Sequence, residues 1–131
     1  MSFERGFMKK ILIAEDDKFL ASAYRVKLSK AQYEVKTVSN GDEALQALDS
    51  FLPDLIILDL MMPVRDGFSF LEEIKKNAKW KNTPIIVASN LSQPDDVVKA
   101  VQMGANGYIV KTDLTMKEVL AKIKKILEDG V

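Results

Sequence analysis

The chain has 131 residues, 47% of them hydrophobic, and its 19 basic and 19 acidic residues cancel. This length fits a single domain, which buries about two-thirds of the surface that its unfolded form exposes. The balanced charge gives no overall field to hold nucleic acid or an anionic membrane, so neither is expected as a direct partner. The chain lacks cysteine and histidine, which excludes disulfides, thiolate metal sites, phosphohistidine carriers and Ser-His hydrolases.

Two further classes lack support in the sequence. No apolar run approaches the roughly 20 residues of a membrane span, and residues 1–7 contain no apolar stretch long enough for a signal peptide. A cytoplasmic location without membrane insertion is therefore expected.

Short runs of β-branched residues and leucine alternate along the chain with segments of helical periodicity. Five strands are predicted, over residues 10–14, 33–38, 55–58, 84–88 and 107–110. Apolar residues that recur at helical spacing predict a helix after each strand. These residues are Leu20, Tyr24 and Leu28; Ala44, Leu45 and Leu48; Phe68, Leu71 and Ile74; Val97, Ala100 and Val101; and Val119, Leu120, Ile123 and Leu127.

Helix boundaries carry the expected capping residues. Asn40 precedes the second helix, and a capping box from Ser92 to Asp95 opens the fourth, with Pro94 in its first turn. Gly104 stands where the fourth helix should end. The sequence therefore predicts five βα units.

The strands differ in their polarity. Those at 10–14, 55–58 and 84–88 are almost wholly apolar, which is typical of parallel strands buried on both faces, whereas 33–38 alternates as an edge strand can. An α/β fold with a doubly wound parallel sheet is predicted. In such sheets the ligand site lies beyond the carboxyl ends of the strands, where the strand order reverses.

Polar residues follow these strand ends. Glu15 and Asp16 follow the first strand and Asp59 follows the third, so neighbouring parallel strands would crowd three carboxylates into one pocket. Crowding of like charge favours a bound cation, and carboxylate oxygens suit Mg²⁺. Ser89 follows the fourth strand and Lys111 the fifth, on the same rim. A carboxylate beside Mg²⁺ is also well placed to accept a phosphoryl group.

This combination resembles the CheY-like receiver domain of the two-component response-regulator family, from about residue 9 to residue 128. The matching residues are Glu15-Asp16, Asp59 with Met62-Pro63 and Asp66-Gly67, Ser89, and Lys111. The resemblance implies a flavodoxin-like sheet with strand order 2-1-3-4-5 and five helices. We expect an N-terminal extension over residues 1–8, the receiver domain over 9–128 and a tail over 129–131. The chain is expected to be either a stand-alone receiver or a receiver cut from a larger protein.

By this resemblance, Asp59 accepts a phosphoryl group from a phosphohistidine on a sensor histidine kinase or phosphotransfer protein. Lys111 and Ser89 are expected to contact phosphoryl oxygens as charge spreads over them. The chain is then no enzyme beyond phosphorylation and dephosphorylation of its own site.

The implied magnesium site uses the acidic residues and one backbone group. Asp16, Asp59 and the backbone carbonyl of Met61 are expected to bind Mg²⁺ directly, and Glu15 through water. Ser89 and Tyr108 stand at the positions of a switch pair that repacks the face made by the fourth helix, fifth strand and fifth helix. A downstream protein target is expected to bind that face.

The chain departs from the family pattern around the acceptor. Thr112 follows Lys111 where the family usually has proline after a cis bond, so either strain or a different loop is expected. Asn90 replaces a very small residue and narrows access for small phosphodonors. Met61 and Leu91 stand where polar side chains can orient a water, which predicts a long-lived phosphoryl state.

Two other functions stay open from the sequence. A pseudo-receiver would bind partners without phosphorylation, and Asn90 and Thr112 favour it slightly. A phosphohydrolase with an Asp nucleophile would need a second acid where Met61 stands. Absent Mg²⁺ binding would favour the first, and turnover of phosphate esters the second.

Overall fold

The computed structural model describes residues 8–91, 93–113 and 115–129. Five parallel strands form one sheet in the order β2-β1-β3-β4-β5, which confirms the predicted fold class and strand order. The strands are β1 (Lys10–Ala14), β2 (Glu34–Val38), β3 (Leu55–Leu58), β4 (Ile85–Ser89) and β5 (Gly107–Val110). The helices are α1 (Lys18–Lys30), α2 (Gly41–Phe51), α3 (Gly67–Lys75), α4 (Pro94–Gln102) and α5 (Met116–Asp129).

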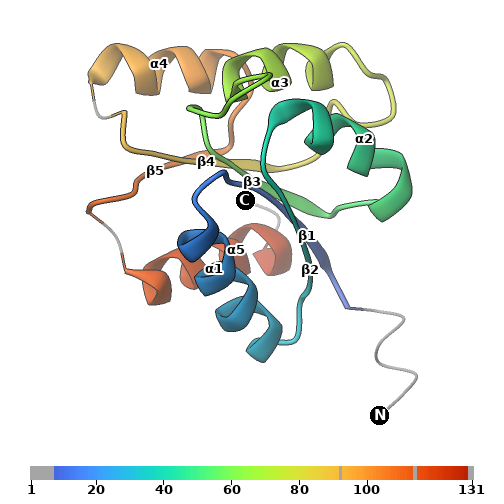
Figure 1. Ribbon diagram of the computed structural model, residues 1–131, viewed down its shortest axis with the longest axis vertical. Coiled ribbons are helices and arrows are strands. Elements are labelled where there is room, and N and C mark those ends of the chain that lie inside the picture. The colour runs from blue at the N-terminus through green and yellow to red at the C-terminus, as the bar shows by residue number, and fades with distance from the viewer. Residues whose placement is uncertain (1–7, 92, 114, 130–131) are drawn as a thin grey trace.

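The helices form two layers, one on each face of the sheet. Helices α1 and α5 lie together on one face, and α2, α3 and α4 cover the other (Figure 1). Because both faces are covered, β1, β3 and β4 are buried along almost their whole length, whereas β2 at the edge is partly exposed. This pattern confirms the prediction from strand polarity. None of the described helices is both long and apolar enough to cross a bilayer.

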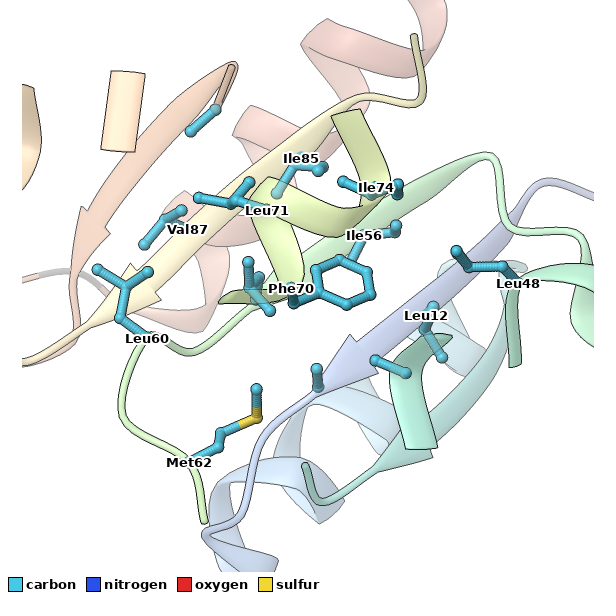
Figure 2. Close-up of a cluster of buried hydrophobic side chains, with 14 of the residues drawn as sticks. Leu12, Leu48, Ile56, Leu60, Met62, Phe70, Leu71, Ile74, Ile85 and Val87 are labelled. Carbon is cyan, nitrogen blue, oxygen red and sulfur yellow. The ribbon is translucent and has the colours of Figure 1, made fainter. Parts of the chain in front are cut away.

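Each face of the sheet has its own hydrophobic core. On the side of α2, α3 and α4, the fully buried ring of Phe70 packs among residues that include Leu12, Ile56 and Ile74 (Figure 2). On the side of α1 and α5, Tyr24 and Ile123 pack against alternate residues of the same strands. The alternation follows from the two-residue period of a strand.

Most helix ends agree with the capping residues expected from the sequence. The side chain of Asn40 accepts a hydrogen bond from the Glu43 amide at 2.9 Å, and Gly104 follows α4 with φ of +106°. Pro94 is in the first turn of α4, after Gln93, whose side chain makes no capping hydrogen bond. The predicted cap Ser92 lies outside the described residues. The predicted strand bounds shift by one residue at β2 and β4, because end residues have fewer neighbours to fix them.

The sheet register aligns the ends of β1 and β3. Ala14 pairs with Leu58, and the Asp59 amide donates to the Ala14 carbonyl oxygen at 2.9 Å. The Glu15 amide donates to the carbonyl oxygen of Val38 on the other side, also at 2.9 Å. The backbone at both acidic positions is thus fixed by the sheet, which positions the candidate site.

Candidate functional site

Three carboxylates meet at the ends of β1 and β3. One ligand atom from each of Glu15, Asp16 and Asp59 lies within 4.8 Å of the others. Glu15 and Asp59 are each only 4% exposed, whereas Asp16 is open to solvent. The structure therefore brings together the three acids that the sequence placed at neighbouring strand ends.

Lys111 reaches this pocket from the end of β5. Its Nζ lies 2.6 Å from Oε1 of Glu15 and 3.1 Å from Oδ2 of Asp59. The Lys111 amide donates to the Ser89 carbonyl oxygen at 2.9 Å, which fixes the backbone at the base of the side chain. One ammonium group thus bridges two buried carboxylates from different strands.

Burial and these hydrogen bonds compete in setting the charge of the site. Burial raises the pKa of Glu15 to about 7, although the hydrogen bond from Lys111 acts to lower it. For Lys111, burial acts to lower the pKa, but the hydrogen bonds to Glu15 and Asp59 outweigh it and raise the pKa. Tyr24 on α1 is affected as well, because burial and then the charges of Glu15 and Asp59 raise its pKa to about 12.

The donor set fits a hard divalent cation. Three carboxylates face a single ammonium group, so the pocket keeps an excess of negative charge when its acids are ionised. Asp16 makes no ion pair with another described residue, and its exposure leaves it accessible to an ion from solvent. Oxygen ligands of this kind suit Mg²⁺.

The second Asp59 oxygen is positioned by the following loop. The Met61 amide donates to Oδ1 of Asp59 at 3.1 Å, while Lys111 occupies Oδ2. Met61 itself is 61% exposed. A cavity of about 610 Å³ opens beside Asp16 and the loop after β3, and Met61 and Leu91 both line it. Met61 and Leu91, which stand where polar side chains could orient a water, therefore line the same cavity.

Ser89 and Tyr108 are joined through the backbone of Leu91. The Leu91 amide donates to Oγ of the fully buried Ser89 at 3.2 Å, and the Tyr108 hydroxyl donates to the Leu91 carbonyl oxygen at 2.7 Å. Among the described hydrogen bonds, none joins Ser89 to the carboxylates. The sequence placed Ser89 and Tyr108 in one region but did not reveal the residue between them.

The loop between β3 and α3 contains a strained turn. The Arg65 amide donates to the Pro63 carbonyl oxygen at 2.7 Å, which closes a three-residue turn around Val64 at φ of +67°. Arg65 anchors this turn, because its Nε lies 2.6 Å from Asp42 and its carbonyl oxygen accepts from the Gly41 amide. Sequence reasoning missed these contacts, since no local pattern marks a turn with valine in the left-handed region.

Replacing Val64 with asparagine is expected to raise the free energy of unfolding by about 1 kcal/mol. A β-branched residue in the left-handed region costs roughly 1–2 kcal/mol, whereas asparagine adopts it readily. The Val64 side chain is 79% exposed, so little packing is lost. Urea unfolding checks this, with Val98→Asn on helix α4 as a control expected to change little. An equal gain in both variants would contradict the assignment of strain to Val64.

The loop after Lys111 differs from the one that a cis bond would give. No cis peptide bond occurs among the described residues, so Lys111–Thr112 is trans, and the Asp113 amide closes a turn on the Val110 carbonyl oxygen at 2.9 Å. Of the two outcomes that the sequence left open for Thr112, the structure shows the different loop.

A sequence model of the response regulator receiver domain matches residues 11–124. The chain belongs to the response-regulator receiver family. Among relatives of this receiver, the sensory transduction protein BceR of Halalkalibacterium halodurans is 37% identical over 120 residues. The probable transcriptional regulator ycf27 of Guillardia theta is 35% identical over 119 residues. These matches cover 92% and 91% of the chain but only 50% and 45% of the relatives, so the receiver spans about half their length.

Solved structures of receivers have the same fold. A response regulator from Chloroflexus aurantiacus matches with a TM-score of 0.85 and 29% identity, over 92% of this chain and 98% of that one. The chemotaxis protein CheY4 of Vibrio cholerae matches with a TM-score of 0.84 and 29% identity, over 91% and 98%. The predicted family and fold are therefore confirmed.

Proposed function

We propose that this receiver is phosphorylated on Asp59 by a phosphohistidine of a sensor histidine kinase or phosphotransfer protein. The observation that carries the proposal is the environment of Asp59, a buried carboxylate with one oxygen facing Lys111 and the other facing the Met61 amide. A buried acid with a cation at hydrogen-bonding distance and two further acids beside it is suited to accept a phosphoryl group.

In the proposed reaction an oxygen of Asp59 attacks phosphorus and the bond from phosphorus to the donor imidazole nitrogen breaks. The electron pair of that bond stays with the imidazole, and Asp59 becomes an acyl phosphate. Lys111 neutralises one phosphoryl oxygen, and the Ser89 hydroxyl donates to another after leaving the Leu91 amide. Asp16, Asp59 and the backbone carbonyl of Met61 would hold Mg²⁺, with Glu15 acting through water, and the ion would supply the remaining positive charge.

Ser89 also connects the acceptor to a switch. Movement of Ser89 toward the phosphoryl group would release the Leu91 amide, and the Leu91 carbonyl oxygen is the partner of Tyr108. A shift of this peptide would therefore change the position of Tyr108 and the face formed by α4, β5 and α5. We propose that a downstream protein binds this face. Phosphorylation would favour one position of Tyr108 over the other because the phosphoryl group makes different contacts in the two conformations.

Incubation with Mg²⁺ and acetyl phosphate or beryllofluoride tests the proposal. NMR of the Ser89 and Tyr108 amides should show Mg²⁺-dependent shifts, and intact mass should show one phosphoryl group after acetyl phosphate. Both effects should vanish in Asp59→Asn. Because we expect Asn90 to narrow the access of small phosphodonors to Asp59, beryllofluoride is the more decisive reagent. Absence of Mg²⁺ binding and of any shift would instead support an interaction module that works without phosphorylation.

Mg²⁺ is expected to stabilise the fold through Asp16. At a concentration about 100 times its dissociation constant, an ion that binds only the folded state adds about 2.7 kcal/mol to the free energy of unfolding. Asp16→Asn should remove most of this gain, whereas Asp113→Asn, an exposed control, should keep it. Thermal unfolding with and without Mg²⁺ measures the difference. An equal response in both variants would exclude Asp16 as a ligand.

Met61 and Leu91 are expected to prolong the phosphoryl state, since neither side chain can orient a water by a strong hydrogen bond. Met61→Asn combined with Leu91→Gln should shorten the lifetime of phospho-Asp59 about tenfold, as a positioned water replaces a random one. Loss of phosphate after removal of the donor, followed by intact mass, gives the lifetime. Val101→Asn on α4 serves as a control, and unchanged lifetimes in the double variant would contradict the expectation.

A further inference from the structure

Lys75, the last residue of α3, is a half-buried amine that the proposed reaction at Asp59 does not use. Its Nζ donates a hydrogen bond to the carbonyl oxygen of Lys81 at 2.9 Å. No ion pair between described residues involves Lys75. Its amine is therefore held by a neutral acceptor and not by a carboxylate.

Nearby lysines have the opposite kind of surroundings. Nζ of Lys76, the next residue along the chain, lies 3.5 Å from Glu72 and 3.8 Å from Glu73. Nζ of Lys79 lies 3.4 Å from Asp49. A neighbouring carboxylate favours the charged form of an amine, so these contacts stabilise the ammonium state in a way that Lys75 lacks.

The stem of Lys75 packs against bare backbone at Gly104, in the turn between α4 and β5. A Cβ at that position would collide with Cε of Lys75 and lie 3.0 Å from its Nζ. This packing removes water from the amine, and burial lowers the pKa of Lys75 below its ordinary value. Only the uncharged amine is a nucleophile, so desolvation activates a lysine.

The segment around Lys75 is strongly basic. Residues 75–82 include four lysines and no acidic residue, although the chain as a whole is neutral. A local excess of positive charge raises the concentration of anions near the surface. An acyl phosphate combines a negative phosphate with an electrophilic carbonyl carbon, so this segment would attract it more strongly than an uncharged acyl donor.

We propose that Lys75 is a modification site that is acylated on Nζ by small acyl phosphates. The amine attacks the carbonyl carbon, and the bond from that carbon to the bridging phosphate oxygen breaks. Phosphate leaves with the electron pair of that bond, and the nitrogen loses a proton to water as the amide forms. Asp59 would attack the same reagent at phosphorus instead, so neither modification requires the other.

The modification would act on the turn between α4 and β5. The Gly104 amide donates to the Val101 carbonyl oxygen at 2.9 Å, and the Ala105 amide donates to the Ala100 carbonyl oxygen at 3.0 Å. An acyl group on Nζ of Lys75 would need space beside Gly104, where the stem already packs closely. Acylation is therefore expected to shift the Gly104 and Ala105 amides in NMR spectra.

Incubation of the full chain with acetyl phosphate at about pH 8, well below the ordinary lysine pKa of about 10.4, tests the proposal. Peptide mass spectrometry at several times gives the acetylation rate of each lysine. Lys75 should react about fivefold faster than Lys76, which is paired with glutamates, and than Lys81, an exposed lysine in the same segment. This preference should disappear in urea that unfolds the chain, because it depends on packing.

Three variants complete the test. Asp59→Asn should lose phosphorylation and keep acetylation of Lys75, so failure of either proposal is visible separately. Lys75→Arg keeps the positive charge and should leave the rate at Lys81 unchanged. Lys75→Gln, which carries a neutral amide, should shift the Gly104 and Ala105 amides more than Lys75→Arg does. Equal rates at Lys75 and Lys81 in the folded chain, or the same preference in urea, would overturn the proposal.

Discussion

Gly67→Ala is expected to lower the free energy of unfolding by about 3 kcal/mol and to displace Asp59, the proposed phosphoryl acceptor. A Cβ on Gly67 would collide with the carbonyl oxygen of Asp59 and lie 2.7 Å from Cα of Leu60. Both neighbours are backbone in a loop anchored to the sheet, so neither can move without disturbing β3. Overpacking of this kind costs typically 1–3 kcal/mol and sometimes more, which exceeds the gain of up to about 1 kcal/mol in helix propensity.

Gly107→Ala provides a matched control, because a Cβ there would lie 3.8 Å from the nearest atom, an ordinary contact with Ile86. Denaturant unfolding measures the loss of free energy of unfolding in each variant. This loss should be several-fold larger for Gly67→Ala than for Gly107→Ala. The Asp59 and Met61 amides should shift in NMR spectra of Gly67→Ala only. Equal stability of the two variants would show that the loop after β3 can adjust.

Lys111→Met is expected to slow phosphorylation of Asp59 about 100-fold or more. Removal of one fixed donor from a developing oxyanion costs about 100- to 1,000-fold in rate. In the parent chain, Nζ of Lys111 lies 2.6 Å from Glu15 and 3.1 Å from Asp59. The substitution also removes this cation from between the two buried carboxylates. Without Mg²⁺, the free energy of unfolding should fall by about 2 kcal/mol. This loss is smaller than that expected for breaking a fully buried ion pair, because water reaches the pocket.

Phosphorylation by acetyl phosphate, followed by intact mass at several times, gives the rate, and thermal unfolding in a chelator gives the stability. Lys117→Met is the control, since Lys117 is exposed on α5. A rate within threefold of the parent chain would remove Lys111 from the proposed chemistry while leaving Asp59 as acceptor. The outcome therefore separates the role of the lysine from that of the carboxylate.

The strands and the meeting of the acids could be predicted from the sequence because both follow from local patterns. Apolar runs define strands, and the carboxyl ends of parallel strands share one edge, so Glu15, Asp59 and Lys111 had to approach one another. The contacts of the loops could not be predicted. The turn at Val64, its anchor from Arg65 to Asp42 and the link through Leu91 depend on backbone conformations that no residue pattern specifies.

The position of Tyr24 illustrates a second limit. Its periodicity placed it correctly on the buried side of α1, yet nothing in the sequence indicated that the charges of Glu15 and Asp59 would add to the effect of burial in raising its pKa. Long-range electrostatics emerges only when the elements are assembled.

The bridge from Lys111 to the acids constrains the order in which the chain acquires structure. Lys111 is 52 residues beyond Asp59, and among the five strands of this sheet β5 comes last in chain order. A nascent chain that ends before β5 contains the crowded carboxylates of β1 and β3 without their cation. Such an intermediate is destabilised by charge repulsion, and closing so long a loop costs chain entropy. Docking of β5 completes both the sheet and its charge balance, so we expect the acidic rim of β1 and β3 to become stable only when β5 is in place.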